Sequence, residues 1–145
     1  MDEKKHKLAL QFAQAIPFCK ALNVRVEEIG NATALLSMPY DPRVIGDPDT
    51  GVVHGGAFFA LLDTCAGLAI FMHPDSTLST ATINLRVDYM RSATPGQRMF
   101  ARAEVYNATR SVAFVRATAW DNDTENPVAT ATGAFTFARP EEAKS

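Results

Sequence analysis

The chain has 145 residues, a formal net charge of −2 from 14 basic and 16 acidic residues, and 47% hydrophobic residues. Its length suits one compact domain over residues 1–145, and its composition excludes disordered and fibrous classes. The near balance of charge gives no broad attraction to nucleic acid or to anionic membranes, so we expect neither as a partner.

The cysteines and the apolar runs indicate where the chain works. Cys19 and Cys65 are the only two cysteines, and their spacing is not that of a small disulfide-linked scaffold. The N-terminal residues contain no sustained apolar signal region, and the longest apolar run, 66–72, is far shorter than the roughly 20 residues of a membrane span. We therefore expect a cytoplasmic protein.

The first third of the chain predicts a helix, a strand pair and a loop. Residues 4–22 have helical spacing, with a kink or a break at Pro17. Residues 23–30 and 32–39 are typical of two strands, and Gly30 and Asn31 supply the turn between them. Residues 40–51 are rich in Pro, Gly and Asp and predict a loop.

The rest of the chain predicts one long helix followed by strands. Residues 55–72 are apolar over most of a helical circumference, which indicates a helix that the rest of the chain surrounds. Apolar and polar residues alternate over 83–89, 98–107, 111–121 and 127–138, and we expect the tail 140–145 to be frayed. Grouped strands after one helix indicate the α+β class, with a curved antiparallel sheet wrapped around the helix.

The start of the long helix carries the candidate chemistry. Gly55 and Gly56 lie where the first N–H groups of the helix lack an intrahelical acceptor, so a substrate oxygen can approach them as in an oxyanion hole. The same glycines also fit a plain loop turn, and His54 fits a structural histidine at a helix start. Asp63 is less easily structural, because its apolar neighbours demand either a partner or a cleft.

Helical geometry separates the two ends of this segment. Nine residues carry Asp63 about 13 Å along the axis from His54 and, at roughly 100° per residue, to the opposite side of the helix. One chain cannot bring both groups to one small reacting group. If they act together, a second subunit supplies one of them, most simply in a twofold dimer with two equal sites.

The segment resembles the hotdog-fold acyl-CoA thioesterases of the phenylacetate-degradation (PaaI) type. Gly51, His54-Gly55-Gly56 and Asp63 match their signature, while Thr82-Ile83-Asn84-Leu85 and Phe135-Thr136-Phe137 resemble their strands. The resemblance implies hydrolysis of an acyl-CoA, with Asp63 as nucleophile or general base, the Gly55 N–H polarising the thioester carbonyl, His54 shaping that pocket and Thr82 orienting the water or the carboxylate. It implies no cofactor and no metal ion, composite sites in a homodimer, and a homotetramer built as a dimer of dimers.

The remaining predictions concern the substrate contacts and one position at which the chain differs from the family's usual pattern. The phosphates of coenzyme A require basic groups near the site, and the remaining contacts come from the helix start and its apolar face. We expect substrate binding by Gly56, Val53, Phe59, Leu62, Arg91, Arg110 and Ser111. Where the family commonly has Asn or Gln, six residues before the histidine, this chain has Pro48, and a substitute carboxylate from Asp47 or Asp49 would repel the developing oxyanion.

Two other functions compete with thioester hydrolysis. A hotdog-fold enoyl-CoA hydratase or dehydratase would need a histidine base aimed at the acyl chain, and Asp63 nine residues after His54 argues against it. A non-catalytic acyl-CoA binding module with a regulatory role usually carries a DNA-binding domain, for which residues 1–22 are too short.

Overall fold

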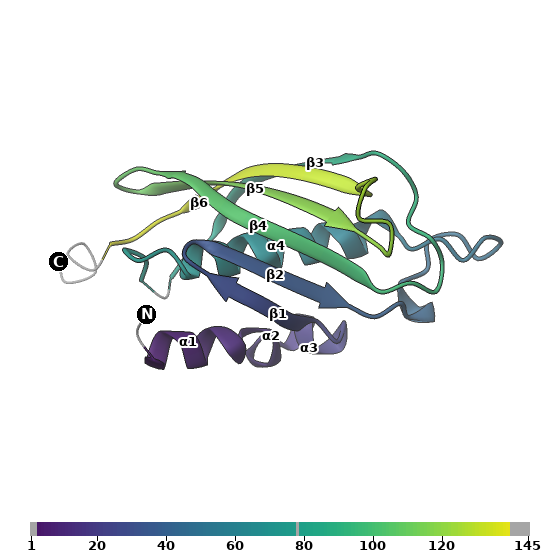
Figure 1. Cartoon of the computed structure of the whole chain (residues 1–145), viewed down its shortest axis with the longest axis horizontal. Helices are drawn as coiled ribbons and strands as arrows, with labels where there is room; N and C mark the ends of the chain where they lie inside the picture. Colours follow the sequence, from purple (N-terminus) through teal and green to yellow (C-terminus); the bar gives the residue numbers. More distant parts are fainter. Residues whose placement is uncertain (1–2, 78, 140–145) are drawn as a thin grey trace.

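The computed structural model describes residues 3–77 and 79–139, which form a curved sheet wrapped around one long helix (Figure 1). The strands are β1 (Arg25–Gly30), β2 (Thr33–Met38), β3 (Thr82–Tyr89), β4 (Met99–Ala108), β5 (Val112–Trp120) and β6 (Ala129–Thr136). They pair antiparallel in the order β1-β2-β4-β5-β6-β3, and the central helix α4 (Gly55–Phe71) packs mainly against β2, β4 and β5. The predicted α+β class and its helix-in-sheet arrangement are confirmed.

The core lies between α4 and the concave face of the sheet. The helix contributes large side chains with no exposed surface, among them Leu61, Leu68 and Ile70. The sheet contributes mostly small side chains. Every second residue of a strand points to the inner face, and many of these inward residues are buried alanines: Ala34, Ala101, Ala103, Ala113, Ala117, Ala119, Ala129 and Ala131. Small residues on the sheet let the bulky helix approach closely. The helix is apolar over most of its circumference, as the sequence indicated.

The N-terminal segment departs from the single predicted helix. It forms α1 (Glu3–Leu10), α2 (Phe12–Ala15) and α3 (Pro17–Ala21), which run alongside β1 in Figure 1. Ile16 has an extended backbone, as expected for a residue before proline, and Pro17 then occupies the first turn of α3. The proline therefore causes a break in the helix, which was one of the two expectations for it. A short 3₁₀ turn, η1 (Pro42–Val44), follows β2.

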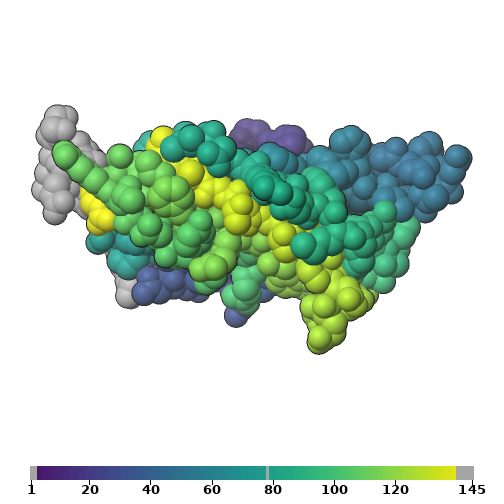
Figure 2. Space-filling model, turned by 90° about the horizontal axis from the view of Figure 1, so that it is seen from above, coloured from purple at the N-terminus to yellow at the C-terminus, as the bar shows by residue number. Residues whose placement is uncertain are grey.

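Strand β3 forms one edge of the sheet. Figure 2 looks onto this edge, where β3 runs along the surface beside β6. The pairing of β3 with β6 shifts register between Thr82 and Asn84, so Ile83 is an extra, bulged residue. Gly133 of β6 pairs with Leu85 just after this bulge, and a Cβ there would stand 2.6 Å from the Asn84 carbonyl oxygen. The bulge therefore follows directly after Thr82, and Gly133 lets the two strands approach closely beside it.

Several strand ends differ from prediction by one to a few residues. The predicted strand 127–138 shortens to Ala129–Thr136, and the strand 111–121 ends at Trp120. Asp121 leaves the ladder because its carboxylate accepts hydrogen bonds from Arg91 and from two backbone N–H groups. The tail 140–145 lies outside the described residues. Across the described part of the chain, none of the helices combines the length and apolar character that crossing a membrane requires.

Candidate active site

The loop before α4 presents His54 at the helix start. Ile45 and Val53 form an isolated bridge, and the His54 N–H donates to the Val44 carbonyl at 2.8 Å. Gly46 packs against this ladder so closely that a Cβ would lie 2.8 Å from the Cα of His54. The loop therefore holds position 54 firmly, although its own tip is exposed.

His54 caps α4 with its ring. Its Nδ1 accepts a hydrogen bond of 2.8 Å from the Gly56 N–H, which is the N-cap role of the helix. A Cβ at Gly56 would lie 2.9 Å from the same nitrogen, so the cap requires glycine there. The structural reading of His54 is thus what the geometry supports, and Gly56 has its N–H occupied.

The Gly55 N–H is left as the open donor of the helix start. No acceptor for it lies within hydrogen-bond distance among residues 3–77 and 79–139. The Gly55 carbonyl accepts from the Tyr89 hydroxyl at 2.6 Å, which ties the first turn of α4 to the end of β3. Burial raises the pKa of Tyr89, so this phenol stays protonated as the donor. An unpaired N–H at a helix start is suited to polarising a carbonyl oxygen.

A cavity of about 340 Å³ adjoins Gly55. It is lined by Val52, Val53, Gly55, Phe58, Tyr89, Met90, Arg91, Ser92, Ala93 and Val128. Val53 lies where it was predicted. Of the two adjacent phenylalanines, Phe58 and not Phe59 lines this cavity, because consecutive helical residues point about 100° apart.

Asp63 lies in a different cavity, in agreement with the helical geometry. It is half-buried, and its Oδ1 accepts a hydrogen bond of 2.8 Å from the Thr82 hydroxyl. This cavity of about 290 Å³ is lined by α4, the N-terminal segment, the start of β3 with the two residues before it, and the end of β6: Phe12, Ile16, Phe18, Cys19, Asp63, Thr64, Gly67, Thr80, Ala81, Thr82 and Phe135. Burial raises the pKa of Cys19, with the Asp63 charge adding to it, so the thiol is a neutral wall of the cavity.

Four of the predicted substrate contacts lie elsewhere. Phe59 is exposed one turn before Asp63 and on the same helix side, away from Gly55. Leu62 has no exposed surface and lines neither cavity, so it belongs to the core and its predicted contact is corrected. Arg110 and Ser111 are exposed on the hairpin between β4 and β5 and line neither cavity.

Arg91 borders the Gly55 cavity but has a structural role. Its five N–H groups all have acceptors in the chain: both carboxylate oxygens of Asp121 and the carbonyls of Ser92 and Asn126. Asp121 is 1% exposed, and the Arg91 guanidinium holds the pKa of this carboxyl far below its usual range against the opposing effect of burial. Arg91 therefore forms an ion pair that joins the loops around it, and its contact with a coenzyme A phosphate stays a prediction.

Position 48 lies at the exposed tip of the loop before His54, and its neighbours do not replace an amide donor. The Asp47 carboxylate accepts from the Thr50 hydroxyl at 2.9 Å and from the Asp49 N–H at 3.0 Å. The Thr50 hydroxyl, helped by that N–H, lowers the pKa of Asp47, so Asp47 is an ionised acceptor committed to the loop itself. This leaves the Gly55 N–H as the donor beside its cavity.

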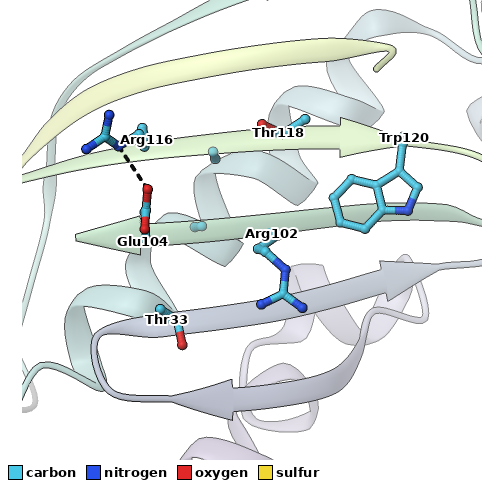
Figure 3. A pocket seen from close by; sticks show the side chains of 8 residues that line it. Thr33, Arg102, Glu104, Arg116, Thr118 and Trp120 are labelled. Atoms are coloured by element: carbon cyan, nitrogen blue, oxygen red, sulfur yellow. Dashed lines mark ion pairs between the residues drawn. The ribbon is translucent and has the colours of Figure 1, made fainter. Parts of the chain in front are cut away.

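A third cavity, of about 280 Å³, lies on the face of the sheet that points away from α4 (Figure 3). Its basic side chains are already paired, Arg116 with Glu104 at 2.9 Å and Arg102 with Glu28 at 2.7 Å. None of its lining residues also lines the cavity beside Gly55 or the cavity of Asp63. We therefore place the candidate active site in the other two cavities.

Residues 50–128 match the family described as Thioesterase superfamily. Medium/long-chain acyl-CoA thioesterase YigI of Salmonella typhimurium is 30% identical over an alignment of 118 positions, which covers 72% of this chain and 76% of that protein. A solved structure from Pseudomonas aeruginosa is 36% identical with a TM-score of 0.79, and the match covers 91% of this chain and 98% of that one. A mutant of the phenylacetic acid degradation protein PaaI from Thermus thermophilus is 27% identical with a TM-score of 0.74, covering 84% and 99%. The resemblance to the PaaI-type hotdog proteins is confirmed.

Proposed function

Because the chain belongs to the thioesterase superfamily, we propose that it hydrolyses acyl-CoA thioesters to a free acid and coenzyme A. The observation that carries this proposal is the Thr82 hydroxyl donating to Asp63 Oδ1 at 2.8 Å at the wall of an open cavity. It leaves the second carboxylate oxygen available for chemistry. The similarity to a protein named as an acyl-CoA thioesterase supports the same reaction.

The two groups have complementary tasks. Asp63 attacks the thioester carbonyl as nucleophile, or acts as general base on the attacking water, while Thr82 keeps it oriented. The Gly55 N–H faces the carbonyl oxygen and stabilises the negative charge that develops on it. His54 contributes by capping the helix and holding Gly55 in place, which makes it a positioning residue.

Strand β3 supports a composite site between two copies of the chain. Thr82 at its start holds Asp63, and Tyr89 at its end holds Gly55, about 23 Å away at some 3.3 Å per residue. Antiparallel pairing of two β3 edges would bring the start of one strand alongside the end of the other. The Asp63 group of one copy would then face the Gly55 group of its partner, twice per dimer.

The exposed surface of β3 favours such a pairing. Ile83 is 53% exposed and Met90, just beyond the strand, is 58% exposed, in addition to the unpaired backbone of an edge strand. A homodimer is therefore part of the proposal. The dimer of dimers, and coenzyme A phosphate contacts by Arg110 and Ser111, stay predictions.

Asp63→Asn tests the proposed reaction. Asparagine can still accept the Thr82 hydrogen bond, so the fold should be kept, but it is neither a base nor a nucleophile of useful strength. We expect release of coenzyme A, followed with a thiol reagent, to fall roughly a hundredfold to ten-thousandfold. Asp49→Asn, at the exposed loop tip, is the matched control and should leave the rate unchanged.

The competing functions predict other results. Unchanged thiol release by Asp63→Asn would refute the role of Asp63. A wild-type chain that binds acyl-CoA and never cleaves it would favour the non-catalytic binding module, and addition of water to an enoyl-CoA without thiol release would favour a hydratase. Sedimentation should give a dimer or a larger assembly, and an active monomer would contradict the composite site.

A further inference from the structure

Gly67 occupies an unexpected position for a glycine. It lies well inside α4, with a buried backbone, where glycine is less favourable than alanine. Gly46 and Gly133 have steric reasons to be glycine, since a Cβ would lie less than 3 Å from backbone atoms. Apart from its two chain neighbours and the backbone of its own helix turns, a Cβ at Gly67 would meet no atom of the described chain within 4 Å. No contact within these residues therefore requires glycine there, and the result is unfilled space.

That space belongs to the cavity of Asp63. Gly67 follows Asp63 by four residues, so the two share one side of the helix, and both line the same cavity. Opposite them the N-terminal segment contributes an apolar wall from Phe12, Ile16 and Phe18. Phe18 is 61% exposed, which is unusual for so large an apolar side chain.

The cavity thus has a polar end and an apolar end. Asp63, Thr64 and Thr82 form the polar end, where the proposed reaction takes place. Gly67 lines the same cavity one helical turn further along α4, and the aromatic and aliphatic side chains of the N-terminal segment line it as well. An apolar cavity with a few polar groups at one end fits a ligand that is itself polar at one end and hydrocarbon along its length.

We propose that Gly67 admits the hydrocarbon tail of a straight-chain acyl group and so sets the longest chain that the enzyme accepts. This inference rests on the proposed thioesterase function. The tail passes over the bare backbone of Gly67 and packs against Phe12, Ile16 and Phe18. A side chain at position 67 fills part of the cavity one helical turn after the reacting carboxylate.

Gly67→Ala and Gly67→Leu test the proposal against a series of straight-chain acyl-CoAs from short to long. For the shortest substrates kcat/KM should stay close to that of the wild type. For the longest it should fall about tenfold with alanine and further with leucine, because each added carbon competes with the tail for space. The length profile is the dependence of kcat/KM on the length of the acyl chain. A profile identical to that of the wild type, or an equal loss of kcat/KM for all lengths, would overturn the proposal.

Gly96→Ala is the matched control. A Cβ at Gly96 also meets open space, but Gly96 has φ +85° and lines neither cavity of the candidate site. Its substitution should lower the Tm and leave the length profile unchanged. Gly67→Ala should not lower the Tm, since alanine is the better helix former. A clear drop would mean that the space is not open, which would also overturn the proposal.

Ligand binding separates this proposal from the reaction itself. If the wild type releases no coenzyme A from any substrate, the proposed function fails, but calorimetric titration with free straight-chain fatty acids still tests position 67. Gly67→Leu should weaken binding of long acids about tenfold or more and leave the binding of short acids unchanged. Equal binding of long acids by Gly67→Leu and the wild type would refute the role of Gly67.

Discussion

Gly55→Pro removes the proposed oxyanion donor with little other change. Proline has no N–H, and position 55 is the first residue of α4, the helical position that proline favours. The preceding residue, His54, already has the extended backbone that proline imposes on its neighbour, with φ −60° and ψ 136°. The added Cβ would lie 3.4 Å from the Tyr89 ring, which is ordinary contact. The substitution therefore deletes an N–H that has no partner in the described chain.

The expected magnitude follows from this geometry. Because no hydrogen bond of the folded chain is lost, the free energy of unfolding should stay within about 1 kcal/mol of the wild type. Loss of one oxyanion donor typically costs about 2.7 to 4 kcal/mol of transition-state stabilisation, which is roughly a hundredfold to thousandfold in kcat. Gly55→Ala keeps the N–H and adds the same Cβ, so it separates the effect of the donor from that of the side chain.

Thiol release under saturating acyl-CoA measures kcat for both variants, and urea denaturation measures their stability. A folded Gly55→Pro with wild-type kcat would refute the role of this N–H. Mixing Gly55→Pro with Asp63→Asn, after reversible dissociation, adds a test of the composite site. Randomly formed dimers should recover about a quarter of the wild-type activity, because half of them contain one intact site of two. No recovery would refute a site shared between chains.

Two further predictions concern the supporting residues. Thr82→Val should lower kcat about tenfold, because a hydrogen bond to a charged group is worth at least about 1.5 kcal/mol; Thr80→Val is the control in the same cavity, since the Thr80 hydroxyl donates to the Thr136 carbonyl instead. Equal kcat for the two would contradict the role of Thr82. The low pKa of Asp121 stabilises the fold above the pKa of the unfolded carboxyl, near 4, and this contribution is lost as the pH falls below it. Asp121→Asn should therefore lower the free energy of unfolding by about 3 kcal/mol at neutral pH. In urea denaturation its stability should also fall less steeply than that of the wild type as the pH is lowered below about 4, and an equally steep fall would contradict this.

The sequence was informative where one chain segment contains the whole signal. The apolar circumference of residues 55–72 and the alternation in the later strands predicted α4 and the strands after it, because both patterns are local. The opposite orientation of the Gly55 and Asp63 ends also follows from helical repeat alone. Strand ends were less predictable, because long-range partners such as Arg91 for Asp121 decide where a ladder stops.

Side-chain roles depended on contacts that no local pattern contains. Arg91 resembles a surface cation in the sequence, and only the fold brings the buried Asp121 to it. Leu62 is fully buried and lines neither cavity of the candidate site, because the rotation of the helix against the sheet sets the direction of its side chain. Gly67 carried a readable signal, since glycine inside a long helix is unfavourable and asks for a reason.

The placement of Gly55 and Asp63 on opposite sides of α4 has a consequence for how activity scales with protein. If each reaction needs both groups at one thioester, a folded chain that has not associated with another copy is inactive. Turnover per chain then rises with concentration and reaches a plateau only when association is complete. Dilution acts as an off switch, so the amount of enzyme in a cell would set both how many sites exist and what fraction of chains can work.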